Sequence, residues 1–268
     1  MGGRRPRSAA DALLTAAGTL AVLLLGLPLV VLVAQGITSR GWEKLPETGV
    51  SQAIALSLLT TAISTALIAL LGTPLAYLFA RRRFPFKSAL IVLVELPIVL
   101  PPAVAGLALL LTFGRRGPFG PLFGSLGIAL PFSTAAVIIA QTFIAAPYFI
   151  RAAQVGFQGI TAEIEDAARV DGASGLTLFR HVTLPLASHA LAAGLILSWA
   201  RALGEFGATI LFAGSLPGRT QTMPLLVYSI FERDISAAIW TGVLLVGMAL
   251  LALLLAQWLT RRAPSPLL

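Results

Sequence analysis

Six apolar runs of membrane-spanning length constrain what this chain can fold into more than any other feature. A transmembrane helix needs about 20 consecutive, mainly apolar residues. Only 11% of the 268 residues are charged, whereas soluble domains carry about 25%. The sequence therefore predicts an all-α integral membrane protein with about six transmembrane helices, folded as a single domain over 1–268. The runs cover residues 12–35, 53–80, 89–113, 133–157, 187–212 and 237–259.

Basic residues gather near the ends of these runs. With both termini placed in the cytoplasm, 12 of the 19 lysines and arginines fall on the cytoplasmic side, as the positive-inside rule requires. Arg115 and Arg116 count against this orientation. The first run is about 24 residues long, so we expect a retained helix and not a cleaved signal peptide. We therefore expect a multi-pass protein of the cell membrane, surrounded by lipid bilayer, with both termini cytoplasmic.

Several function classes are disfavoured by composition. The net charge of +8 is not concentrated on a soluble domain, so nucleic-acid binding is not expected. The chain has no cysteine, which excludes disulfides and thiolate metal sites, and we expect no metal site. A membrane-embedded enzyme would need histidines, cysteines or acids clustered at membrane depth, so we predict no catalytic residue. We also expect no regulatory domain after Arg262.

Two consecutive prolines interrupt the third run. Pro101 and Pro102 lack the backbone donors that would bond to the carbonyl groups of Pro97 and Ile98. Freed backbone groups at membrane depth are tolerated only where protein or water satisfies them. We predict a kink or a break at this point.

The segment 158–186 is polar and lies between two apolar runs. It cannot sit in hydrocarbon, so we expect it at the cytoplasmic surface, within reach of another molecule. Ala167 and Ala168 are small enough for a close approach, and Gly172 suits a left-handed turn that ends a short helix. Pro185 suits the start of the next helix. From these residues alone, an ordinary solvated loop with a helical turn is the favoured interpretation.

Opposite charges occur inside the fifth run. Arg201 and Glu205 are four residues apart, so on a helix they share one face and can pair. Charges at membrane depth usually face a partner or a cavity. One interpretation is a structural ion pair that locks helix packing. The other is a face of a translocation path or gate, with Gly204 and Gly207 allowing close approach and Thr209 offering its hydroxyl group.

The polar segment resembles the EAA loop of ATP-binding-cassette importer permeases. That loop reads E-A-A, three residues, G, nine residues and I-x-L-P, and the spacing here is the same, with Asp166 in place of glutamate and Val182 in place of isoleucine. The resemblance implies a type I importer (MetI-like) permease fold and a coupling helix that docks on a cytoplasmic ATPase. The residues it assigns to ATPase coupling are Glu165, Asp166, Ala167, Ala168, Asp171, Gly172, Leu184 and Pro185.

No G-x-x-x-x-G-K-[ST] phosphate loop is present in the chain, so a separate ATPase subunit must hold ATP and Mg²⁺. We therefore predict a transport subunit that is not itself an enzyme and binds no cofactor. The resemblance further implies a homodimer, two ATPase subunits and an extracytoplasmic binding protein.

Three further motifs resemble the molybdate/tungstate branch of these permeases, whose nearest relatives carry sulfate. They are LPIVLPPAVAG over 96–106, ALGEFGAT over 202–209 and PGRTQTMPL over 217–225. The resemblance implies an oxyanion importer, with Arg115, Arg116 and Arg219 on the outside to attract the anion or to dock its binding protein. A sulfate or thiosulfate permease is the first alternative. A secondary transporter driven by ion gradients is the second, although Arg201 and Glu205 alone make a poor ion relay.

Overall fold

Helices make up most of the part of the protein that the structure describes. The computed structural model describes residues 9–262, and this part of the chain contains no β-strand. The first half comprises α1 (Ala9–Thr38), the 3₁₀ helix η1 (Arg40–Thr48), α2 (Val50–Arg81), α3 (Lys87–Val99), α4 (Pro102–Phe113) and α5 (Gly120–Ser125). The second half comprises α6 (Thr134–Gln158), α7 (Ala162–Val170), α8 (Gly175–Leu178), the π-helical turn η2 (Phe179–Thr183), α9 (Leu184–Leu203), α10 (Gly207–Phe212), α11 (Met223–Phe231) and α12 (Ile235–Arg262). The expectation for the chain after Arg262 lies outside the described residues.

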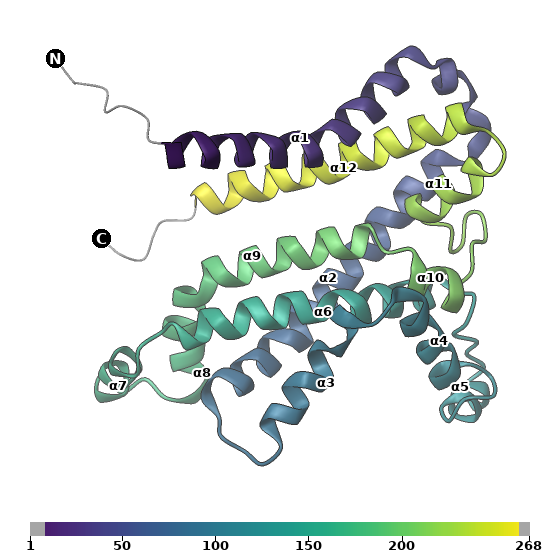
Figure 1. Cartoon of the computed structure of the whole chain (residues 1–268). Helices are drawn as coiled ribbons and strands as arrows, with labels where there is room; N and C mark the ends of the chain where they lie inside the picture. Colours follow the sequence, from purple (N-terminus) through teal and green to yellow (C-terminus); the bar gives the residue numbers. More distant parts are fainter. Residues whose placement is uncertain (1–8, 263–268) are drawn as a thin grey trace.

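The expected all-α membrane fold is confirmed. Within the described residues, five helices are long and apolar enough to cross a membrane, and α3 with α4 makes a sixth span if the bent pair is counted as one. Figure 1 shows the start of α1 and the end of α12 at the same end of the molecule as α7, with α4, α5, α10 and α11 toward the other. The polar segment therefore lies at the end of the molecule where α1 begins and α12 ends.

The predicted break in the third run is confirmed. The axes of α3 and α4 differ by 118°. Leu100 and Pro101 are extended, with ψ of 135° and 130°, and Pro102 opens α4, where its missing N–H group costs no hydrogen bond. The two prolines therefore end one half-helix and begin another.

The fifth run differs from the expected continuous span over 187–212. Its helix begins earlier, at Gly175, continues through η2 and ends at Leu203. The chain then breaks, and the short helix α10 starts at Gly207. A Cβ atom on Gly207 would lie 2.7 Å from the Cβ atom of Pro102. The second break thus packs directly against the first.

Small residues allow the central helices to approach closely. A Cβ atom on Gly156 of α6 would lie 2.4 Å from the Cβ atom of Ala190 on α9, and one on Gly194 of α9 would lie 2.9 Å from that of Ala152 on α6. Membrane helices associate through such close backbone contacts because lipid removes the hydrophobic drive between them. Phe149 and Phe157 fill the core that α2, α6 and α9 share.

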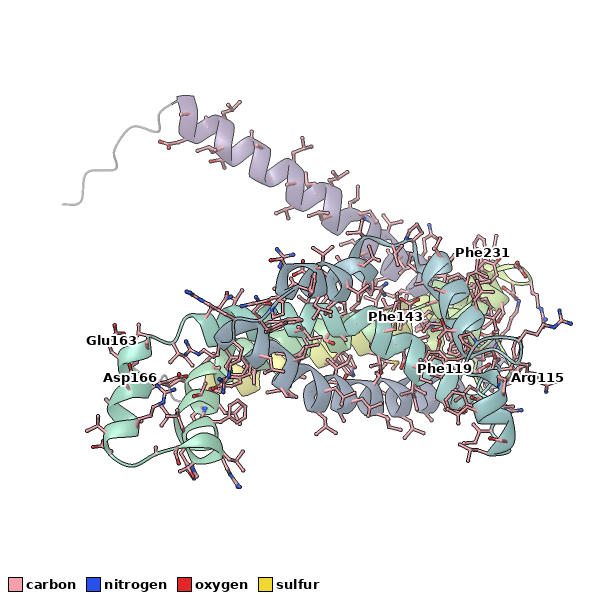
Figure 2. All side chains as sticks on the ribbon, turned by 90° about the horizontal axis from the view of Figure 1, so that it is seen from below. Arg115, Phe119, Phe143, Glu163, Asp166 and Phe231 are labelled. Atoms are coloured by element: carbon pink, nitrogen blue, oxygen red, sulfur yellow. The ribbon has the colours of Figure 1, made fainter. Side chains whose placement is uncertain are left out.

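In contrast, α1 stands apart from the body. Its apolar side chains are exposed over most of its length, and Figure 2 shows it diverging from the other helices. Near its C-terminal end, Gly36 approaches α12, where a Cβ atom added to this glycine would lie 2.9 Å from Cγ2 of Val243. The bare apolar surface of α1 suits contact with lipid.

Candidate functional site

The polar segment folds into a short, capped helix. Thr161 is extended and precedes α7, whose first turn carries Glu163 and Glu165, the favoured charge at a helix N-terminus. At the other end Gly172 has φ +91°. Its N–H group donates to Arg169 O at 3.0 Å, and the N–H group of Ala173 donates to Ala168 O at 2.9 Å, the pair of bonds that defines a Schellman motif. The predicted left-handed turn at Gly172 is confirmed.

The faces of α7 differ sharply. Glu165 is 5% exposed, whereas Val170 is 88% exposed. Ile164, Asp166 and Ala167 are exposed as well, and Figure 2 shows Glu163 and Asp166 at the outer edge of this end of the protein. Apolar side chains rimmed by charge, on a helix outside the membrane body, form a surface suited to another protein.

The remaining residues assigned to coupling lie on both sides of the turn. Asp171 follows α7 and is exposed, and Leu184 is half-buried in the first turn of α9. Pro185 stands in the first turn of α9, as expected, but this helix continues directly from α8 and η2 and does not follow a loop. The N–H group of Leu184 bonds to Phe179 O, five residues back. This wider π-helical turn accommodates a residue without an N–H group.

An arginine that the sequence argument counted only as an inside charge contacts α7. Nη2 of Arg81, the last residue of α2, lies 3.0 Å from Oε1 of Glu165 and 3.0 Å from the carbonyl oxygen of Ile160. Oγ1 of Thr183 lies 3.1 Å from the same Oε1 atom. No spacing rule links Arg81 to a carboxylate 84 residues away, so the sequence offered no signal for this contact.

The charges of the fifth run pair, but not along a helix. Nη1 of Arg201 lies 2.6 Å from Oε2 of Glu205, and Glu205 stands beyond the end of α9. Its Oε1 accepts a hydrogen bond of 2.8 Å from the N–H group of Ala208, which satisfies a donor at the start of α10. Glu205 is 1% exposed, while the Arg201 side chain is 26% exposed. The carboxylate therefore stabilises the break, and the guanidinium group reaches the surface.

The three residues expected beside this pair have different surroundings. Gly207 sits against Pro102, as described above. Gly204 is exposed, and among the described residues a Cβ atom there would meet only Ala200 O, at 3.7 Å, so none of them approaches Gly204 closely. Thr209 is fully buried, and its Oγ1 has no hydrogen-bond partner among the described residues.

The opposite end of the molecule carries the three arginines that were expected on the outside. Arg115 and Arg116 line a cavity of about 550 Å³ between α4 and the segment before α6, and Figure 2 places Arg115 at the end opposite Asp166. Arg219 lies in the loop before α11, where its carbonyl oxygen accepts a hydrogen bond of 2.8 Å from Thr134 Oγ1. Arg219 does not line the cavity beside Arg115 and Arg116. The three arginines are therefore not one cluster.

Sequence reasoning missed a larger cavity at the end where α11 lies. It measures about 720 Å³ and is lined by η1, the start of α2 and the segment 215–237. Glu232 accepts a hydrogen bond from Tyr228 and raises the pKa of that phenol. Lys44 donates to the carboxylate of Asp234 and holds its pKa below the ordinary value. The motif over 217–225 supplies part of the lining, which was the available signal.

Known proteins give one consistent result. Residues 72–263 match the family model described as binding-protein-dependent transport system inner membrane component. The chain is 40% identical to the molybdenum transport system permease protein ModB of Mycobacterium tuberculosis, covering 87% of this chain and 88% of the relative. Identity to the protein of the same name from Escherichia coli K12 is 36%, with coverage of 78% and 93%. The sulfate transport system permease protein CysW of Synechococcus elongatus is 37% identical, with coverage of 82% and 77%.

Solved structures share the fold at lower identity. A bacterial ABC transporter that imports alginate matches with a TM-score of 0.73 at 18% identity, over 94% of this chain and 96% of that one. The MetNI methionine ABC transporter matches with a TM-score of 0.62 at 18% identity, over 84% and 99%.

Proposed function

This chain belongs to the family of binding-protein-dependent transport system inner membrane components, and on that premise we propose that it is the permease subunit of an ATP-driven molybdate importer. Two copies would form the translocation path, with two ATPase subunits on the cytoplasmic side and an oxyanion-binding protein outside. Both termini would be cytoplasmic. Tungstate is an equal candidate for the cargo because the two oxyanions have nearly the same size and charge.

The exposed face of α7 is the observation that carries the transport proposal. Asp166, Ala167 and Val170 are presented outward on a capped helix beyond the apolar body, at the same end as the start of α1 and the end of α12 (Figure 1). A secondary transporter has no use for such a surface. An ATPase that closes on ATP would move α7, and α9 would follow because the chain is helical from Gly175 to Leu203.

Arg201 gives the path its chemistry in this proposal. Glu205 is enclosed and committed to Arg201 and to Ala208, whereas the guanidinium group is partly exposed. The positively charged Arg201 is therefore the accessible residue of the pair, and an oxyanion binds favourably to a guanidinium group. Because α4 and α10 meet at Pro102 and Gly207, a shift of either half-helix would move both breaks, and alternating access would switch between their two arrangements.

Outside, Arg115, Arg116 and Arg219 would attract the anion or dock its binding protein. Charge-reversal variants at each position test this role separately. Loss of binding-protein stimulation supports it, and unchanged uptake at all three positions overturns it.

Reconstitution tests the function as a whole. The tagged permease is copurified with its ATPase, placed in liposomes and supplied with binding proteins loaded with molybdate, tungstate or sulfate. Stimulation of ATP hydrolysis by a molybdate-loaded protein, lost in Asp166→Lys, supports the proposal. Stimulation by the sulfate-loaded protein alone would favour the alternative function, a sulfate or thiosulfate permease. The 37% identity to a sulfate permease is the observation that supports this alternative. Uptake that is driven by an ion gradient without an ATPase would contradict the proposal of an ATP-driven importer.

A further inference from the structure

We propose that Glu165 is a positioning residue that fixes α7 to the cytoplasmic end of α2 through Arg81, so that α2 moves with α7. The inference rests on the proposed function, in which α7 receives the movement of the ATPase. It gives that movement a second route into the membrane, besides the continuous helix that leads from η2 into α9.

Three elements meet at the Glu165 carboxylate. Oε1 lies 3.0 Å from Nη2 of Arg81 on α2 and 3.1 Å from Oγ1 of Thr183 in η2. Oε2 lies 3.5 Å from Nη2 of Arg169 on α7 itself. The residue is 5% exposed. Glu165 was assigned to ATPase contact by resemblance, but its side chain faces the permease.

Arg81 holds the start of α7 at two points. The same Nη2 atom that meets Glu165 also donates to the carbonyl oxygen of Ile160, which lies just before α7. The Arg81 side chain is 19% exposed. A guanidinium group with two fixed acceptors on the segment 160–165 restricts both the position and the direction of the short helix.

The other ion pairs of α7 do not have this property. Arg169 and Asp166 pair within the helix, and their side chains are 49% and 67% exposed. Exposed pairs of this kind contribute little and are screened by salt. Breaking a buried pair is costly because it leaves one charge without compensation. The Arg81–Glu165 ion pair is therefore the contact that can transmit force between α7 and α2.

The far end of α2 reaches the outer cavity. Ser57 Oγ accepts a buried hydrogen bond of 2.8 Å from the N–H group of Met223, the first residue of α11. Ser57 and Arg81 are 24 residues apart on one helix, a rise of about 36 Å. At this end, Gln52 and residues of the segment 215–237 line the larger cavity. A displacement of α2 would thus reach the start of α11, four residues after Arg219, which is proposed to attract the anion or dock its binding protein.

Neutral variants of the two partners test the role. Glu165→Gln and Arg81→Gln are reconstituted with the ATPase and the loaded binding protein, and uptake is measured per ATP hydrolysed. We expect each to lower this ratio about fivefold to tenfold, within the range of coupling between linked sites. The matched controls are Arg82→Gln and Arg83→Gln, which change exposed charges directly after Arg81 and should leave the ratio unchanged.

The double variant separates a shared role from two independent ones. If the pair acts as a unit, Arg81→Gln with Glu165→Gln should be no worse than either single change, whereas independent sites give additive losses. A merely structural contact would lower the yield and Tm of the complex without changing uptake per ATP, and that outcome would overturn the proposal. Arg81→Lys, which keeps the charge but not the planar fork, replaces Arg81→Gln if the latter does not accumulate.

Failure of the proposed function would look different. In that case the unaltered complex would show no stimulation by any loaded binding protein, and the variants would have nothing to change. Stimulation in the unaltered complex, combined with a normal uptake ratio in Glu165→Gln, would remove this inference alone.

Discussion

Two buried glutamates of this protein, Glu165 and Glu205, pair with arginines in opposite ways. Glu205 pairs with Arg201, four residues earlier, and bonds to the N–H group of Ala208, three residues later. Glu165 pairs with Arg81, which is 84 residues away on another helix. The first carboxylate stabilises a local break in the chain, and the second joins two separate elements. The same residue type thus stabilises a break in the membrane body and joins two helices at the end where α7 lies.

This difference predicts different consequences for stability and for coupling. Loss of Glu205 should harm the fold first, because the carboxylate is 1% exposed and has a buried backbone donor as well as a charge to satisfy. Loss of Glu165 should reduce energy coupling first. Its partners lie on α2 and η2, and both of these elements also pack against the membrane body through other contacts. If either variant behaved differently from this expectation, the proposed difference between the two glutamates would be wrong.

Glu205→Ala should have the largest effect on stability. It leaves the Arg201 charge without its partner and the Ala208 N–H group without an acceptor, which should cost about 3 to 5 kcal/mol. Thermal unfolding in lipid nanodiscs measures the loss. Glu95→Ala is the control, because the Glu95–Arg151 pair is longer, at 3.9 Å, and more exposed. Equal unfolding temperatures for the two variants would contradict the assigned role of Glu205.

Gly207→Ala should have the next largest effect. The new methyl group would lie 2.7 Å from the Pro102 Cβ atom and 3.3 Å from the N atom of Ala103, so α4 and α10 would have to separate. Overpacking of this kind costs about 1 to 3 kcal/mol. Gly204→Ala is a sharp control because its methyl group would meet only one atom, at 3.7 Å. If both variants lost uptake and stability equally, the contact between the two breaks would not be the cause.

Gly172→Ala should have a smaller effect, confined to α7. No atom of the described residues lies within 4 Å of a Cβ atom added to Gly172. The cost of the substitution therefore comes from the φ of +91° and should be about 1 kcal/mol. We expect weaker ATPase copurification with an almost unchanged Tm. Gly159→Ala, at φ −71°, is the control before the same helix, and a similar loss there would argue against the turn as the cause.

Features that depend on near neighbours could be predicted from the sequence. The break at Pro101 and Pro102, the turn at Gly172 and the pairing of Arg201 with Glu205 each depend on residues within a few positions of one another. Local backbone chemistry decides such features, and a missing donor or a needed left-handed conformation is visible in the residue type.

Features that depend on tertiary contacts could not be predicted. No proline near Leu203 indicates the break that follows it. The break occurs where Gly207 packs on Pro102, which is more than 100 residues earlier in the sequence. The inward direction of Glu165 depends on Arg81 and Thr183, which the fold brings to it. The resemblance placed Glu165 in the right segment, but only packing distinguishes its buried face from the exposed face of Asp166.

Asp234, at the start of α12, offers the smallest effect on stability and the clearest pH dependence. Asp234 accepts a bond from Lys44 and caps α12 through the N–H groups of Ser236 and Ala237, and these contacts lower its pKa. A depressed carboxyl pKa stabilises the fold fully above the ordinary aspartate value, and that stabilisation is lost as pH falls through the lowered value.

Asp234→Asn keeps an oxygen for the cap but removes the charge. We therefore expect the Tm of the unaltered protein to fall more than that of the variant between about pH 5 and pH 3, where an ordinary aspartate begins to protonate. The difference should be small because the group is exposed to solvent and its ion pair is screened. Repeating the titration at high salt should shrink the Lys44 contribution further, while the cap persists. An equal acid shift in both proteins would mean that the charge of Asp234 does not stabilise this end of α12.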